Sequence, residues 1–147
     1  MMNPAWLFAI ATVIGVFGIL MAFKNLMKKV GNKLEQGQSV STDSIKQELT
    51  KFFIHVAFAE SVPIILIVFA FIQMESVTEE ISIIIPLVII LLVESIALIN
   101  VWAARRDIIG YEKQSNQARN SINSLCFIGI ALLSAIPIIS MVGLSIL

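Results

Sequence analysis

The sequence predicts an all-α integral membrane protein whose four transmembrane helices form two antiparallel helical hairpins. Of its 147 residues, 58% are hydrophobic and only 14% are charged, and the mean hydropathy is +0.93. A soluble domain of this size does not need so much apolar surface. Four apolar runs, roughly 5–23, 52–73, 81–104 and 125–147, are each about as long as the roughly 20 residues that a bilayer requires. These runs exclude a soluble enzyme or a nucleic-acid-binding domain.

The first run is interpreted as a retained helix, because it lacks a charged start and a small-residue cleavage site followed by polar sequence. Small residues recur along it at steps of four, three and four, which places them on one helix face: Ala11, Gly15, Gly18 and Ala22. Such a face lets two helices approach closely in lipid. Two alternatives remain open for it, packing within one hairpin or contact between subunits.

The connection 24–51 is the longest polar segment. The first helix is expected to continue through Lys29, and the second to begin near Ser44, where serines and Asp43 precede Glu48 in the manner of a helix start. Neither this connection nor 105–124 contains a glycine-rich phosphate loop, a Cys/His metal spacing or a nucleophile elbow. We therefore expect no catalytic residue, no metal site and no cofactor.

The second run contains Glu60, three residues before Pro63. A carboxylate at the bilayer centre costs roughly 2.5–3.5 kcal/mol on insertion scales, so its presence usually reflects a function. Pro63 cannot donate to the carbonyl of Ala59 and leaves a free acceptor beside the carboxyl. With the hydroxyl of Ser61, these residues are the first candidate ion-binding group. The structural alternative is a protonated Glu60 that only joins helices.

The third run contains a second carboxylate, Glu94, again followed by a serine, Ser95. At 1.5 Å per residue, Glu60 and Glu94 lie about 13–17 Å from the charged edges at Lys51 and Arg105, so their depths match. In one interpretation the second hairpin moved its carboxylate to the third helix. In another the two carboxyls face each other and share a proton.

The fourth run repeats the second one without its carboxylate. The segment Leu133-Ser134-Ala135-Ile136-Pro137 matches Ala59-Glu60-Ser61-Val62-Pro63 in spacing. Ser134 stands three residues before its proline, where the second run has Glu60. The repeat predicts a duplicated hairpin with halves 1–74 and 75–147, and adds Ser134 to the candidate ion-binding residues. The single cysteine, Cys126, excludes an internal disulfide.

Charge placement predicts the topology. All ten basic residues fall in or beside two connections: Lys24, Lys28, Lys29, Lys33, Lys46, Lys51, Arg105, Arg106, Lys113 and Arg119. The connection between the second and third runs carries only acidic charges. The positive-inside rule therefore places both long connections in the cytoplasm and both termini outside.

The second run resembles the outer helix of the c subunit, the proteolipid of rotary ATP synthases and ATPases. It has the aromatic pair Phe52-Phe53 eight and seven residues before Glu60, and a proline three residues after it. The segment from Ser134 to Leu144 is similar to the same helix, with Ser134 at the carboxylate position. Two fused hairpins with one such carboxylate are similar to the duplicated proteolipids of vacuolar-type rotors.

The chain departs from that family in three places. Only Gly15 and Gly18 remain of the first helix's dense glycine run, the Arg-Gln/Asn-Pro loop motif is missing, and the first connection is far longer. The family's sodium binders use a further polar side chain from the first helix, usually Gln, and here that helix offers only Thr12. The resemblance therefore implies a proton, with sodium as the less favoured ion.

These observations lead to two functional hypotheses. In the first, the chain is a proteolipid-like subunit of a homo- or hetero-oligomeric ring in lipid, not catalytic by itself, and carries a proton on Glu60. The resemblance then implies an a-subunit-like stator and a cytoplasmic partner, as in a rotary ATPase or ATP synthase. In the alternative, it is a non-rotary structural or accessory protein, such as a ring, a small channel or a complex subunit, that kept the hairpin fold.

Overall fold

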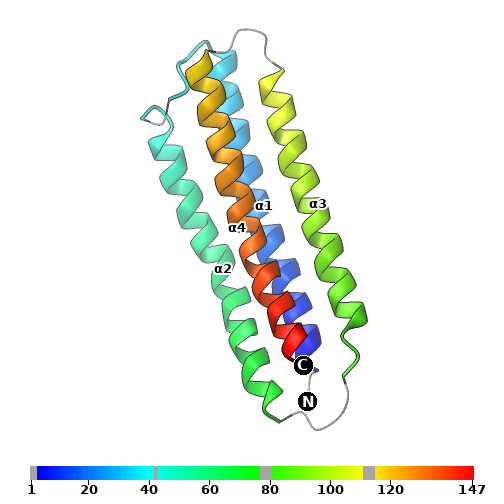
Figure 1. Ribbon diagram of the computed structural model, residues 1–147. Coiled ribbons are helices and arrows are strands. Elements are labelled where there is room, and N and C mark those ends of the chain that lie inside the picture. Colours follow the sequence, from blue (N-terminus) through cyan, green and yellow to red (C-terminus); the bar gives the residue numbers. More distant parts are fainter. Residues whose placement is uncertain (1–2, 42, 77–80, 111–114) are drawn as a thin grey trace.

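The computed structural model describes residues 3–41, 43–76, 81–110 and 115–147, and within these ranges the regular structure is entirely helical (Figure 1). Its four helices are α1 (Pro4–Glu35), α2 (Lys46–Met74), α3 (Ile84–Ile109) and α4 (Asn116–Ile146). Each is long and apolar enough to cross a membrane. The predicted class, an all-α membrane protein with four spanning helices, is confirmed.

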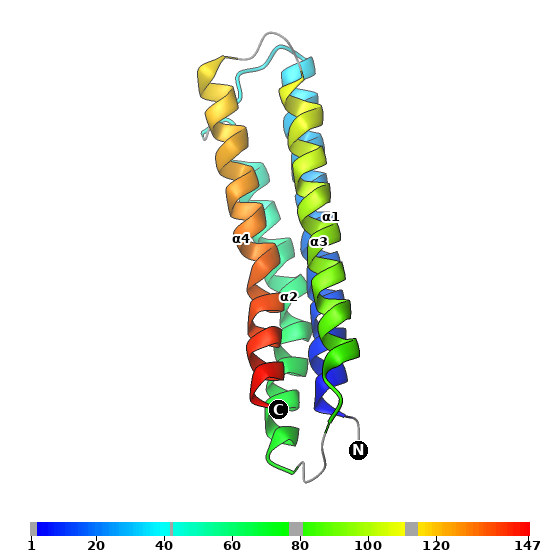
Figure 2. The ribbon, with the colours of Figure 1, turned by 45° about the vertical axis from the view of Figure 1, so that its right-hand side comes forward.

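The bundle has two chemically different ends. The start of α1, the end of α2, the start of α3 and the end of α4 lie at one end, which we call the terminal end (Figures 1 and 2). The opposite ends of the four helices lie at the other, the basic end, toward which the described lysines and arginines are gathered. This is the arrangement that alternating spans require. Which side of the membrane each end faces remains a prediction from charge.

The helices extend further than the apolar runs. At the start of α1, the Asn3 side chain accepts a hydrogen bond from the amide of Ala5 at 2.9 Å, a standard cap for exposed amides. The same helix was expected to continue through Lys29 but ends at Glu35, because Val30 is still buried in the bundle core. The second helix begins at Lys46, two residues after the expected Ser44.

The four helices pack around α1. Helix α1 packs against all three others, and α3 packs against α4, while α2 touches α4 only slightly. Among the described residues, α2 makes no contact with α3. Helix α4 therefore lies over the seam between α1 and α3, whereas α2 rests on α1 with its far side open.

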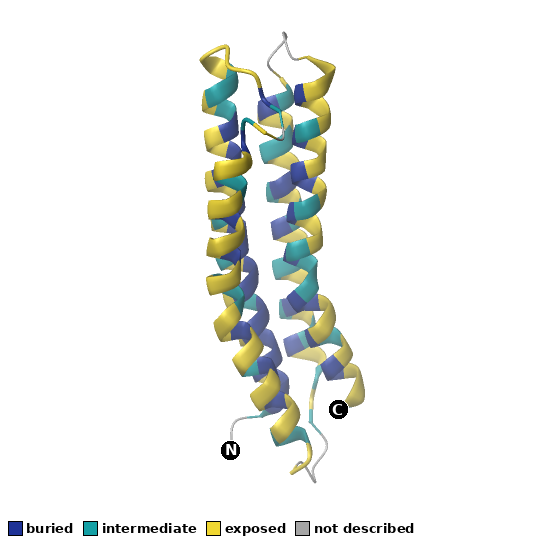
Figure 3. Cartoon of the chain, turned by 90° about the vertical axis from the view of Figure 1, so that its left-hand side faces the viewer, coloured by how far each residue is buried: buried dark blue, intermediate teal, exposed yellow. Residues whose placement is uncertain are grey.

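Burial follows this arrangement. In α1, 56% of the apolar stretch is buried, compared with 39% in α4 and 22% in each of α2 and α3. Figure 3 shows the buried residues on the inward faces and the exposed ones on the outward faces. The exposed side chains include large apolar ones such as Phe58 and Ile99, which suits a lipid-facing surface. Helices α2 and α3 are thus the two open edges of the bundle.

Glycines of α1 allow the first hairpin to pack closely. A Cβ on Gly18 would lie 2.7 Å from the Cβ of Ala59 on α2. A Cβ on Gly15 would lie 3.1 Å from Cγ of Pro63 and would also collide with the Ile136 side chain of α4. At these two positions the small-residue face serves packing within the chain, which answers the alternative left open by the sequence.

Glycines of α4 do the same for the contact between the halves. The ring of Phe23 on α1 occupies the space beside Gly129, where a Cβ would lie 2.5 Å from a ring carbon. The ring of Phe8 lies similarly against Gly143. Both rings are fully buried, so α1 and α4 interlock by placing an aromatic ring over a glycine at two levels.

Candidate functional site

Glu60 lies at the border between the bundle and its surroundings. Its side chain is half-buried, and the next two residues on α2 are exposed. Among the residues that the structure describes, none donates a hydrogen bond to its carboxyl. The adjacent Ser61 is exposed and donates instead to the backbone carbonyl of Phe58 at 2.7 Å, as helix serines commonly do. The Glu60 carboxyl is therefore open to a proton or to a neighbouring molecule.

Pro63 fixes the position of Glu60 relative to α1. Its ring is buried against Gly15, and α2 continues through it as a helix. Since proline has no N–H, the carbonyl of Ala59 lacks its usual partner four residues ahead. Ala59 itself packs on Gly18. The free carbonyl of Ala59 and the close contact between α1 and α2 thus both lie within one turn of Glu60.

Glu94 and Ser134 form a second polar group, between α3 and α4. The hydroxyl of Ser134 donates to Oε1 of Glu94 at 2.5 Å, a length typical of an O–H···O⁻ bond. The second carboxyl oxygen, Oε2, is buried and has no hydrogen-bond partner. Ser95 is exposed and donates to the carbonyl of Leu91 at 2.7 Å. The structure therefore brings Glu94 to Ser134, and leaves Ser95 outside the pair.

The two polar groups lie at one depth. Pro63 of α2 and Ile136 of α4 both meet Gly15, and α2 and α4 run in the same direction (Figure 1). Glu60 precedes the first of these residues by three positions and Ser134 precedes the second by two. Their heights along the bundle therefore agree to about 1.5 Å, the rise of one residue, near the middle of the spans.

Equal depth does not bring the two carboxyls together. Helices α2 and α3 make no contact in the described part of the chain, so Glu60 and Glu94 do not face each other within one molecule. The structure thus gives no support within one chain to the hypothesis that they share a proton. Instead, Ser134 of α4 pairs with Glu94.

Sequence reasoning missed a third polar contact, between α1 and α4. The hydroxyl of Thr12 donates to the hydroxyl of Ser140 at 2.9 Å, and both residues are completely buried. The two positions are 128 residues apart, and neither lies in a recognisable motif, so no local pattern could have paired them. Gln73, near the end of α2, has a buried Oε1 without a hydrogen-bond partner, and sequence reasoning did not single it out.

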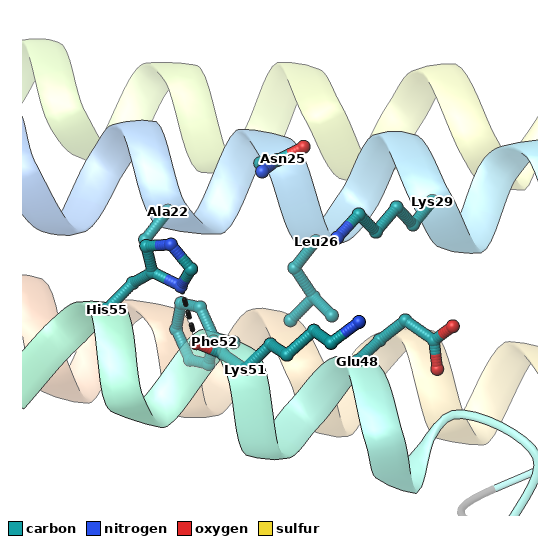
Figure 4. Close-up of a pocket in the computed structure, with 8 residues that line it drawn as sticks. All are labelled: Ala22, Asn25, Leu26, Lys29, Glu48, Lys51, Phe52 and His55. Carbon is teal, nitrogen blue, oxygen red and sulfur yellow. Dashed lines mark hydrogen bonds between the residues drawn. The ribbon is translucent and has the colours of Figure 1, made fainter.

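A separate polar cavity lies between α1 and α2 at the basic end (Figure 4). Its volume of about 20 Å³ is enough for one water molecule. Lys29, Glu48, Lys51 and His55 line it, and Nδ1 of His55 is 2.6 Å from the carbonyl of Lys51. The cavity is more than a turn of α2 away from Glu60, so it belongs to the end of the bundle and not to the mid-span groups.

Charges near this cavity hold the long connection in place. The ammonium of Lys33 lies 3.3 Å from Glu48 and donates to the carbonyl of Ser44 at 2.6 Å. Burial alone raises the pKa of Glu48, but a backbone hydrogen bond and the neighbouring Lys33 and Lys29 outweigh it, so the pKa lies below its ordinary value. This ion pair is a structural clamp between α1 and the start of α2.

The mid-span groups offer few ligands. No group of three or more His, Cys, Asp or Glu side chains that could hold a metal ion occurs among the described residues. One carboxyl with a hydroxyl or a free carbonyl is sufficient for a proton. Comparison of the chain with protein-family models, curated proteins and solved structures gave no match.

Proposed function

We propose that the chain is the repeating subunit of a proteolipid-like membrane ring and carries a proton on Glu60. The observation that supports this best is the position of Glu60: mid-span and half-buried on α2, the helix whose far side is open. A neutral, protonated carboxyl can face lipid, whereas the ionised form requires water or a cation from a partner. Such a carboxyl can therefore load and release a proton as its surroundings change.

The arrangement of the helices favours a ring. Helix α4 is seated over the seam between two helices, α1 and α3, whereas α2 has only α1 beneath it. A second copy whose α3 packs beside α1 would give α2 an equivalent seam. This contact joins two different surfaces, and such head-to-tail contacts close into rings when their rotation allows. The open edges α2 and α3 are the two surfaces that it would use.

Thr12 favours a proton over sodium at Glu60. Sodium needs several oxygen ligands, and Thr12 is the polar side chain that the membrane-spanning part of α1 provides. It is fully buried and already bonded to Ser140 of α4. In this proposal the counter-charge that discharges Glu60 comes from a stator-like partner in the membrane, and the basic end contacts a cytoplasmic partner.

One feature favours the alternative, a non-rotary structural or accessory membrane protein. Ten residues separate the end of α1 from the start of α2, where the resemblance implies a short loop with a docking motif. Lys33 clamps this connection through the carbonyl of Ser44 and through Glu48. A fixed, longer connection would suit a partner other than a rotary head, or a ring that does not rotate.

The test of proton transfer is Glu60→Gln in the purified protein, reconstituted with its membrane partners in vesicles. The variant should keep the assembly and lose proton movement, because Gln preserves size and polarity and removes only the titrating group. Glu75→Gln, which changes an exposed acid one residue beyond α2, is the matched control and should transport normally. Normal transport by Glu60→Gln would exclude Glu60 as the carrier.

The test of the ring is the image of the purified detergent complex together with its mass. Several copies arranged around an axis, with α2 of one copy against α1 and α3 of the next, are expected. A monomer, or a symmetric dimer joined through identical faces, would contradict the ring. A closed ring in which wild-type protein moves no protons would favour the structural alternative.

A further inference from the structure

We infer that Glu94 and Ser134 form a second ion-binding site, between α3 and α4, for a hard monovalent cation, either a proton or sodium. The site lies inside one molecule and does not depend on Glu60 or on ring formation. Three features of the described residues support it: an incomplete buried carboxyl, the lack of a protein cation to balance it, and its relation to the sequence repeat.

The first feature is the incomplete carboxyl. Ser134 satisfies Oε1 of Glu94 with a bond of 2.5 Å, but Oε2 is buried without any partner. A buried polar atom without a partner is costly, and a buried unpaired charge is costlier still. The pair is therefore complete only when something binds at Oε2. A proton or a small cation meets that requirement directly.

The second feature is the charge around the site. Helix α1 has no titratable side chain from Pro4 to Phe23, and α4 has only Cys126 from Asn120 to Ile146. Cys126 is eight residues from Ser134, about 12 Å along the helix, and α2 does not contact α3. The nearest cation on α3, Arg105, is about 16 Å away and donates to Asn123 at 2.9 Å. Within the described part of the chain no lysine or arginine neutralises Glu94, so in this inference the balancing charge comes from solution.

The third feature is the repeat. In the first half the carboxyl stands three residues before the proline, at Glu60, and in the second half Ser134 stands there. The structure shows a carboxyl delivered to Ser134 from α3. Pro137 also lacks the N–H that would bond the carbonyl of Leu133, so the same turn of α4 has a further oxygen to offer. The second half thus has a carboxyl site in which the carboxyl comes from α3 and the serine before the proline comes from α4.

The site differs from Glu60 in what closes it. Both residues are half-buried, but Glu60 accepts no hydrogen bond from the described residues, whereas Glu94 is covered on one side by Ser134 of α4 of the same chain. A cation at Glu94 is therefore held by the protomer itself and stays bound when Glu60 is discharged. Binding at this site couples to the contact between α3 and α4, and stabilises the second hairpin.

The experiment uses the full chain in nanodiscs, with infrared difference spectra of carboxyl groups and thermal unfolding, each recorded across pH and sodium concentration. Glu60→Gln serves as the background, so that Glu94 is the carboxyl that remains within the spans. Ser134→Ala tests the pair, and Ser95→Ala is the matched control, because that exposed serine bonds only its own helix. Glu94→Gln assigns the signals.

A bound proton predicts a protonated-carboxyl band that Glu94→Gln removes and Ser95→Ala leaves unchanged. In Ser134→Ala the band should move in frequency, because the carboxyl loses its hydrogen bond from the serine hydroxyl. Bound sodium predicts instead a sodium-dependent rise in the unfolding temperature, with the half-saturating concentration about tenfold higher in Ser134→Ala.

Either result supports the site and identifies its ion. The inference is overturned if the wild-type and Glu60→Gln proteins show neither a protonated band from Glu94 nor a sodium response. It is also overturned if Ser134→Ala and Ser95→Ala behave alike. These readouts need no transport, so they remain informative if Glu60 proves not to carry protons, and the wild-type spectra remain informative if Glu94→Gln fails to fold.

Discussion

The two hairpins differ in how each one treats its mid-span polar group. In the first, Glu60 is half-buried at an open edge and its serine neighbour bonds the backbone. In the second, Glu94 is bonded by Ser134 on the facing helix and one of its oxygens is buried. The same depth and the same sequence repeat thus produce one open carboxyl and one covered carboxyl. Position in the bundle, more than local sequence, decides which is available to a partner.

The largest effect is expected where the two halves interlock. Gly129→Ala places a methyl group against the buried Phe23 ring and should lower the free energy of unfolding by about 1–3 kcal/mol through overpacking. Gly31→Ala, where a Cβ lies 3.8 Å from Ile108, is the matched control and should be neutral or stabilising by about 0.5–1 kcal/mol. Thermal unfolding in detergent measures both. Equal stability of the two variants would show that α1 and α4 are not tightly interlocked.

The next effect concerns the covered carboxyl. Ser134→Ala removes the only donor to Glu94 in the described structure and should destabilise the protein by about 1–2 kcal/mol, since bonds to charged or buried acceptors are among the stronger ones. Ser61→Ala in the first hairpin should cost almost nothing, because its hydroxyl bonds its own helix. If Ser134→Ala and Ser61→Ala unfold at the same temperature, the two hairpins do not differ in how they bond their mid-span groups.

A smaller effect is expected for the hydroxyl pair between the halves. Thr12→Val keeps the shape of the side chain but removes the bond to Ser140. Hydrogen bonds between membrane helices average about 0.6 kcal/mol, so a loss of that order is expected in the free energy of unfolding. The loss in free energy of unfolding for the double variant, Thr12→Val with Ser140→Ala, should not exceed the sum of the losses for the two single variants. A cost of several kcal/mol would mean that this pair, and not the aromatic interlock, holds the halves together.

The smallest effect is a pH dependence confined to the first hairpin. The pKa of Glu48, which lies before the apolar segment 52–73, is held below its ordinary value by its backbone hydrogen bond and Lys33, despite some burial. A depressed folded-state pKa adds stability above the unfolded value near 4.5, and this is lost as the pH falls through the folded value. Wild-type protein should therefore lose slightly more stability than Glu48→Gln between about pH 5 and pH 3. Parallel unfolding curves for the two proteins would show that the clamp contributes nothing.

Much of the fold could be predicted from the sequence, because its signals are local. Apolar length identified four spans, and glycine spacing identified the face of α1 that meets Ala59 and Pro63. The carboxyls were also recognisable, since a charge inside an apolar run is conspicuous. Helix ends were less accurate, because Val30 is buried by contacts from another helix and no local pattern records them.

The pairing of the polar groups could not be predicted. Ser134 bonds Glu94 across 40 positions in the chain, and Thr12 bonds Ser140 across 128. Both contacts exist because α4 packs against α1 and α3. That packing depends on the whole bundle, and no local sequence motif records it. Sequence reasoning therefore named Glu94 and Ser134 as separate candidates but did not pair them.

The central place of α1 has a consequence for biogenesis. This helix is made before the other three, and each of them packs directly on it. The four helices can therefore assemble in the order of their synthesis, with each new span finding its principal neighbour already in the bilayer, and no span needs to wait for a distant one. Helix α4 closes both the aromatic interlock and the Glu94 pair, so the bundle is complete only once α4 has been synthesised.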